Sequence, residues 1–101
     1  EEGEVITKAM IVRGDKLTIN YDATLNDGGT LRVEILDAKR QPIPGLTFKK
    51  CDALTGDKID QLVTWDGSED LKFISGKPIH LRFVMKGADL FSFKFINPDQ
   101  A

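Results

Sequence analysis

Alternation of apolar and polar residues with a period of two limits the fold of this chain more than any other feature. It is clearest over residues 16–21 and 78–86. In the first of these segments Leu17, Ile19 and Tyr21 share one face, and polar residues occupy the other. Because successive side chains of a strand point to opposite faces, this pattern predicts strands with one face in a core and the other toward water.

Turn residues separate these segments along the whole chain. Further strands are predicted over 4–12, 30–36, 46–49, 59–65 and 90–96, and residues 69–76 can hold one short helical turn. The strongest turn signal is Asn-Asp-Gly-Gly at 26–29, since these residues tolerate positive φ. Seven or eight short strands without an amphipathic helix predict an all-β fold, an antiparallel β-sandwich of jelly-roll-like form.

Length and charge narrow the class of protein. A chain of 101 residues is expected to form one β-sandwich over 1–101. The net charge of −2 argues against nucleic acid as a partner. The longest apolar runs are about four residues, against about 20 for a spanning helix, so no membrane partner is expected. The chain begins at Glu1 rather than Met, and we expect it to be a module excised from a longer chain.

Catalytic patterns are missing from the sequence. It contains no Gly-x-Ser-x-Gly motif, phosphate-binding loop or dinucleotide fingerprint. His80 falls on the outward face of the segment 78–86, with no Ser or Cys partner that a motif would identify. The loop carboxylates form two clusters, Asp52, Asp57 and Asp60, and Asp66, Glu69 and Asp70. No pair among them is singled out for glycoside hydrolysis, and the chain is predicted not to be an enzyme.

Metal and thiol chemistry are restricted by residue numbers. One His and one Cys cannot build a His/Cys zinc site or an intrachain disulfide. The acidic run 66–70 has ligands that suit calcium but lacks the pattern of an EF-hand, so a structural calcium ion stays open and no other cofactor is expected. Cys51 follows Lys49 and Lys50, which would lower a thiol pKa. Free cysteines are usually buried, and we predict a core residue.

Aromatic residues bear on sugar binding, because the C–H face of a sugar stacks on a flat ring. Alternation over 90–96 places Phe91, Phe93 and Phe95 on one apolar face, which predicts packing. Trp65 has two interpretations. It shares a face with Val63, which favours the core, and it ends a strand beside a turn, which favours the rim of a site.

Several short stretches also occur in a recognisable order. They are ITKA and GDKLTIN (6–9, 14–20), LRVEILD and PIPGL (31–37, 42–46), CD and GD (51–52, 56–57), VTW and DL (63–65, 70–71), GKPIHLRF (76–83) and ADLFSF (88–93). Together they resemble the C-terminal β-sandwich attached to secreted bacterial proteins related to glycoside hydrolases, especially those with a five-bladed propeller like the invertase and sialidase groups. The resemblance covers nearly the whole chain.

The resemblance implies an accessory domain that packs on the catalytic domain of its parent chain, binds carbohydrate, or does both. The catalytic carboxylates of such proteins lie in the propeller, so no catalytic residue is carried over. A secreted, periplasmic or cell-surface location is implied as well. The resemblance would also place a glycine-bearing turn at 39–41, where this chain has Lys-Arg-Gln.

These observations predict a non-catalytic carbohydrate-binding or accessory module of an exported polysaccharide-active protein. The alternative is a purely structural β-sandwich that buttresses a catalytic domain and binds no small ligand. The predicted carbohydrate site is Trp65, Asp66, His80 and Arg82. In this hypothesis the indole is the stacking platform, and the other three side chains bind sugar hydroxyls.

Overall fold

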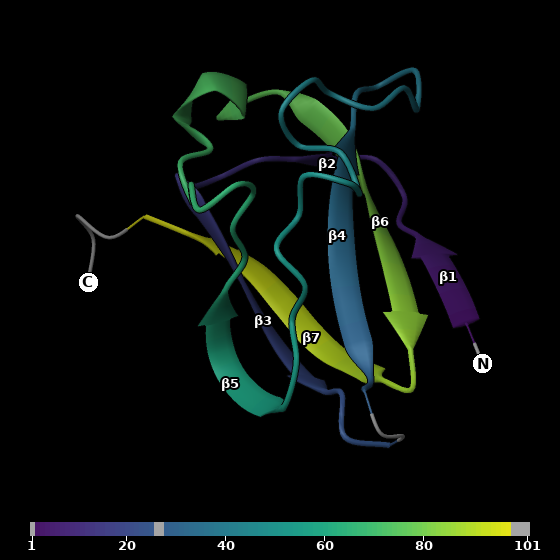
Figure 1. The fold of residues 1–101 in the computed structure, drawn as a ribbon. Helices are drawn as coiled ribbons and strands as arrows, with labels where there is room; N and C mark the ends of the chain where they lie inside the picture. The colour runs from purple at the N-terminus through teal and green to yellow at the C-terminus, as the bar shows by residue number, and fades with distance from the viewer. Residues whose placement is uncertain (1, 26–27, 98–101) are drawn as a thin grey trace.

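The computed structural model describes residues 2–25 and 28–97, which form two antiparallel sheets facing each other (Figure 1). The strands within these residues are β1 (Glu2–Ile6), β2 (Met10–Ile11), β3 (Lys16–Asp22), β4 (Thr30–Leu36), β5 (Asp57–Leu62), β6 (Pro78–Lys86) and β7 (Asp89–Ile96). A short 3₁₀-helix, η1 (Lys72–Ile74), lies where the helical turn was expected. Within the described residues, no helix is long and apolar enough to cross a membrane.

Strand order confirms the predicted sandwich. In one sheet β6 pairs with β1, β2 and β4, and in the other β3 lies between β5 and β7. From β2 to β7, each strand belongs to the sheet opposite the one before it. This alternation between sheets is the jelly-roll-like feature of the fold, and it makes nearly every connection cross the core.

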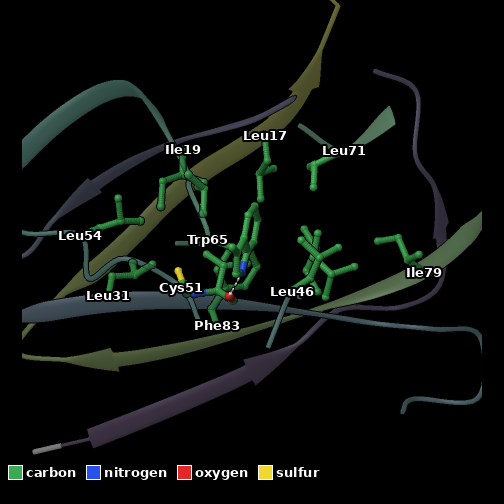
Figure 2. Close-up of a cluster of buried hydrophobic side chains, with 14 of the residues drawn as sticks. Leu17, Ile19, Leu31, Leu46, Cys51, Leu54, Trp65, Leu71, Ile79 and Phe83 are labelled. Atoms are coloured by element: carbon green, nitrogen blue, oxygen red, sulfur yellow. Dashed lines mark hydrogen bonds between the residues drawn. The ribbon is translucent and has the colours of Figure 1, made fainter. Parts of the chain in front are cut away.

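The core comes from the period-two alternation of the sequence. Leu17 and Ile19 of β3, Val33 of β4, and Leu81 and Phe83 of β6 are all buried between the sheets, and Figure 2 shows part of this cluster. The ring of Phe83 lies 5.3 Å from that of Phe93, which links β6 to β7 across the sandwich. Each such side chain contributes about 1.5–3 kcal/mol when fully buried.

The structure differs from the predicted strands at three places. The segment expected as one strand over 4–12 is interrupted after Ile6, because three residues of this chain face two residues of β6. Residues 46–49 form a turn rather than a strand, in which the Thr47 carbonyl accepts from the amides of Lys50 and Cys51. The strand expected over 59–65 begins earlier, at Asp57, and ends at Leu62.

Two of the turns have a non-glycine residue with positive φ, and only one of these two contains a glycine. In the turn Trp65–Ser68, Asp66 and Gly67 have φ of 50° and 80°, the positive values that a tight two-residue turn needs at both positions. Arg40 has φ of 64° within the stretch where a glycine turn was expected. The Asp37 carboxylate stabilises this turn, since it accepts from the amides of residues 39 and 41 at 2.8 and 3.0 Å. The predicted turn at 26–29 lies partly outside the described residues.

Candidate functional site

Trp65 lies in the core and not at the rim of a site. Its side chain is 3% exposed, and its Nε1–H donates to the Val33 carbonyl at 3.0 Å. Figure 2 shows the ring among the buried side chains, close to Cys51, with which Trp65 forms a β-bridge. A ring closed off from solvent offers no face to a sugar. The rim interpretation is therefore corrected, and the face shared with Val63 explains the burial.

The indole and the thiol close an edge of the sheet. The backbone N–H and C=O of Val33 point away from β6, along the free edge of β4. The carbonyl accepts from the Trp65 indole, and the amide donates to Cys51 Sγ at 3.3 Å. On either side, Leu31 exchanges two backbone hydrogen bonds with Leu54, and Ile35 bonds to the chain at 43 and 46. Because an open edge exposes unpaired backbone groups, these contacts complete the sheet at an edge where the described chain places no further strand.

Cys51 is buried and free, as predicted. Burial disfavours the thiolate and raises the pKa of the Cys51 thiol to about 11, even though two lysines precede it in the chain. The residue is thus an unreactive part of the core at neutral pH.

Asp66 is exposed at the tip of its turn and forms an ion pair with Lys50 at 3.3 Å. The turn is fixed by Asp52, whose Oδ2 accepts from Thr64 Oγ1 at 2.6 Å and from the Gly67 amide at 2.8 Å. Both hydrogen bonds lower the pKa of the Asp52 carboxyl, and the one from Thr64 has the larger effect. Both acidic residues therefore have structural partners.

His80 is only 6% exposed, so its expected place on an open strand face is corrected. It does occupy the outer side of β6, but its Nδ1 lies 2.9 Å from the carbonyl of Thr7, at the interruption between β1 and β2. The Thr7 hydroxyl also accepts from the Leu81 amide at 2.9 Å. The extra residue in this segment leaves backbone groups out of register, and the imidazole and the hydroxyl compensate for that irregularity.

Arg82 also lies on the outer side of β6, where two carboxylates occupy its donors. Its Nε and Nη2 contact Glu4 Oε2, and its Nη1 lies 3.1 Å from Glu34 Oε1. The hydrogen bond that Arg82 donates to Glu4 is the main reason that the pKa of Arg82 is raised. The second oxygen of Glu34 accepts from the amide of Phe48 at 2.9 Å, so this ionic group ties segment 43–54 to the sheet.

The four predicted site residues do not form one surface. Trp65 and Asp66 belong to the turn after β5, whereas His80 and Arg82 belong to the outer side of β6. Among the described residues, no hydrogen bond or ion pair joins the first two to the second two.

The acidic run 66–70 is likewise divided among separate partners. Asp66 pairs with Lys50, Glu69 lies 3.9 Å from Lys16, and Asp70 accepts from the amide of Lys72. The described part of the chain holds no group of three His, Cys, Asp or Glu side chains arranged for a metal ion.

A groove that the sequence analysis missed lies on the outer face of the β5–β3–β7 sheet. It has a volume of about 390 Å³ and is lined by Lys16, Thr18, Asp60, Leu62, Lys94 and Ile96. The ammonium of Lys94 lies 3.8 Å from the carboxylate of Asp60, and both side chains are largely exposed. Thr18 is buried between them, and its Oγ1 has no hydrogen-bond partner among the described residues.

Strand register explains why these side chains meet. Thr18 of β3 pairs with Leu62 on one side and Lys94 on the other. Since Leu17 and Ile19 point into the core, Thr18 faces outward with both of its partners. The groove is therefore the middle of an open sheet face.

Two bulges shape the rest of this face. The pairings of β3 with β5 and with β7 both shift near Asn20, whose side chain accepts from the Asp60 amide at 2.6 Å and donates to Ser92 Oγ at 2.7 Å. At these irregularities Ile59 is 81% exposed and Phe91 is 65% exposed. The prediction that Phe91 packs with Phe93 and Phe95 is wrong for this reason, because a bulge interrupts the alternation on which it depended.

No protein-family model, curated protein or solved structure matches this chain.

Proposed function

We propose that this protein is a non-catalytic carbohydrate-binding or accessory β-sandwich module of an exported polysaccharide-active protein, with the outer face of the β5–β3–β7 sheet as its ligand face. The observation that supports this most is the 390 Å³ groove on that face, with exposed apolar side chains on the same sheet. The outer face of an antiparallel sheet is normally polar and solvated. An apolar exception marks a surface that contacts something else.

The groove offers the two kinds of contact that a sugar needs. Leu62 and Ile96 supply apolar surface for the C–H face of a pyranose, and the exposed ring of Phe91 offers a stacking surface farther along β7. The Asp60 carboxylate accepts and the Lys94 ammonium donates hydrogen bonds to hydroxyls at the rim. The volume falls at the lower end of the roughly 300–1,000 Å³ of small-molecule sites, which suits a short glycan segment.

The hydroxyl of Thr18 adds a specific contact. A buried polar group without a partner is destabilising, so its presence at the groove calls for an explanation. The long side chains of Lys16 and Lys94 line the same groove, and a ligand that displaces them reaches this hydroxyl. A sugar hydroxyl, which both donates and accepts, is a suitable partner.

The second candidate is a purely structural sandwich that buttresses the catalytic domain of its parent chain. Exposed Ile59 and Phe91 favour it too, because apolar patches also mark protein contacts. The two candidates differ in one respect. Only the first requires that a free glycan bind the isolated protein.

Electrophoresis in gels containing soluble polysaccharides tests the proposal. We expect at least one polysaccharide of a broad panel to retard the protein, and Lys94→Ala and Phe91→Ala to lose most of that retardation. Phe73→Ala is the matched control, since Phe73 is 55% exposed on η1 and does not line the groove. If no glycan retards the wild-type protein, the structural candidate replaces the binding one. Equal retardation of all three variants would reject the assignment of this face.

A further inference from the structure

Two arginines on the outer side of the other sheet have very different surroundings. Arg32 of β4 and Arg82 of β6 both lie against the ring of Phe48, with guanidinium carbons 5.3 and 5.8 Å from its centroid. Arg82 is neutralised by Glu4 and Glu34. The guanidinium of Arg32 has no hydrogen bond or ion pair among the described residues, and its buried Nε lacks a partner.

Arg32 lines a pocket of about 240 Å³ together with Thr30, Phe48, Val84 and Lys86. The strand register builds it, because Arg32 pairs with Val84 and Thr30 pairs with Lys86 across β4 and β6. The pocket therefore holds two cationic groups, one hydroxyl and one aromatic wall, in a protein whose net charge is −2.

The described carboxylates beside this pocket, Glu4 and Glu34, already have partners. Both oxygens of Glu34 are used, one by Arg82 and one by the amide of Phe48. The Glu4 carboxylate contacts Arg82 as well, so the guanidinium of Arg32 has no carboxylate partner among the described residues.

We infer that this pocket binds an oxyanion, meaning the carboxylate, sulfate or phosphate group of a small ligand. A guanidinium that stacks on a ring keeps its in-plane N–H edge for bidentate contact with such a group. The hydroxyl of Thr30 and the ammonium of Lys86 add a donor and a second positive charge. A volume below that of ordinary small-molecule sites limits the bound part to one charged group and its immediate neighbours.

This inference is independent of the glycan groove, because the pocket lies on the outer side of the opposite sheet. Anion binding would also explain why the fold tolerates the Nε–H of Arg32, which has no partner within the described residues. A buried guanidinium N–H without an acceptor is destabilising, and an oxyanion supplies that acceptor once the guanidinium turns slightly toward the pocket.

An NMR titration of the ¹⁵N-labelled protein tests it, with sodium phosphate, sodium sulfate and galacturonate as three separate probes at constant ionic strength. Galactose serves as the uncharged counterpart of galacturonate. We expect saturable shifts at Thr30, Arg32 and Lys86 with at least one anion and none there with galactose. The probe that binds most tightly distinguishes a carboxylate from an inorganic anion.

Arg32→Gln should weaken that binding at least tenfold. The variant is expected to fold, since the guanidinium makes no hydrogen bond or ion pair within the described chain. Arg13→Gln is the matched control, because Arg13 is exposed, outside the pocket and carries the same charge. We expect it to change the affinity less than twofold. An absence of saturable shifts with all three anions, or an equal loss in both variants, would overturn the inference.

Discussion

The free edge of β4 and the outer face of the β5–β3–β7 sheet are completed to different degrees. Along β4, Leu31, Val33 and Ile35 all have their outward N–H and C=O groups paired, and segment 43–54 with Trp65 supplies the partners. On the other sheet, the buried hydroxyl of Thr18 has no partner within residues 2–25 and 28–97, and Ile59 and Phe91 are exposed. Side chains at the β4 edge therefore stabilise the fold, whereas those of the outer face of the β5–β3–β7 sheet, called the open face below, can contact the ligand that we propose.

Trp65→Ala gives the largest effect that this comparison predicts. The substitution removes a large buried ring and leaves the Val33 carbonyl unpaired, so we expect a loss of about 3–5 kcal/mol in the free energy of unfolding. Urea denaturation of the wild type and the variant measures it. A loss below about 1 kcal/mol would contradict a structural role for this ring.

Alkaline pH tests the same edge through Cys51. The pKa of the thiol is about 11 in the folded protein against 9.0 in its ordinary range, so the folded state holds the proton more tightly. The resulting stabilisation is complete below pH 9 and is lost as the pH rises through 11. At about 1.4 kcal/mol per pH unit, we expect a loss of roughly 2–3 kcal/mol.

Urea denaturation at several pH values between 8 and 11 measures this loss, with Cys51→Ala as the comparison. Burial also raises the pKa of Tyr21, and that contribution is common to both proteins. The variant is less stable at every pH but should fall less steeply above pH 9. Parallel curves for the two proteins would show that the thiol is not protected.

Substitution of Glu34 tests how much the contact between segment 43–54 and the sheet contributes to stability. Glu34→Ala leaves the Phe48 amide and one Arg82 donor unpaired, and we expect a loss of about 1–3 kcal/mol. Glu4→Ala is the control, because Glu4 contacts the same guanidinium from a more exposed position and should cost below about 1 kcal/mol. Thermal or urea denaturation of both variants measures these losses in the free energy of unfolding. Equal losses would mean that the contact with the Phe48 amide adds nothing.

The sequence predicted the sandwich because alternation is a local signal. It located β3, β4 and β6 closely, and the turn chemistry at 66–67 appeared in the expected place. Alternation did not predict which candidate site residues are buried. Burial of Trp65 depends on the carbonyl of Val33, 32 residues away, and no local pattern reports such a contact.

The open face was missed for a related reason. Both bulges near Asn20 depend on cross-strand contacts with Asp60 and Ser92, which alternation within one strand does not contain. Phe91 was therefore counted with the core residues. The polar Asn20 near the end of the strand predicted over 16–21 was the available signal, since Asn suits an irregular position better than a regular ladder.

The open face gives the smallest effects on stability. Thr18→Val keeps the shape of the side chain and removes a hydroxyl that has no partner in the described part of the chain, so the free energy of unfolding should stay unchanged or rise by up to about 1 kcal/mol. Phe91→Ala should cost less than about 1 kcal/mol because the ring is exposed. Both variants should bind the retarding glycan less tightly. A large loss of stability in either variant would mean that the residue stabilises the fold as the side chains at the β4 edge do.

A titration of the ¹⁵N-labelled protein with an oligosaccharide from the retarding polysaccharide tests the division between the two regions most directly. Trp65 is the single tryptophan, so its indole N–H gives one separate signal for the completed edge of β4. We predict saturable shifts of the Thr18, Asp60 and Lys94 amides and an unmoved Trp65 indole signal. Shifts that centre on Trp65, with the β3, β5 and β7 amides unchanged, would contradict the account.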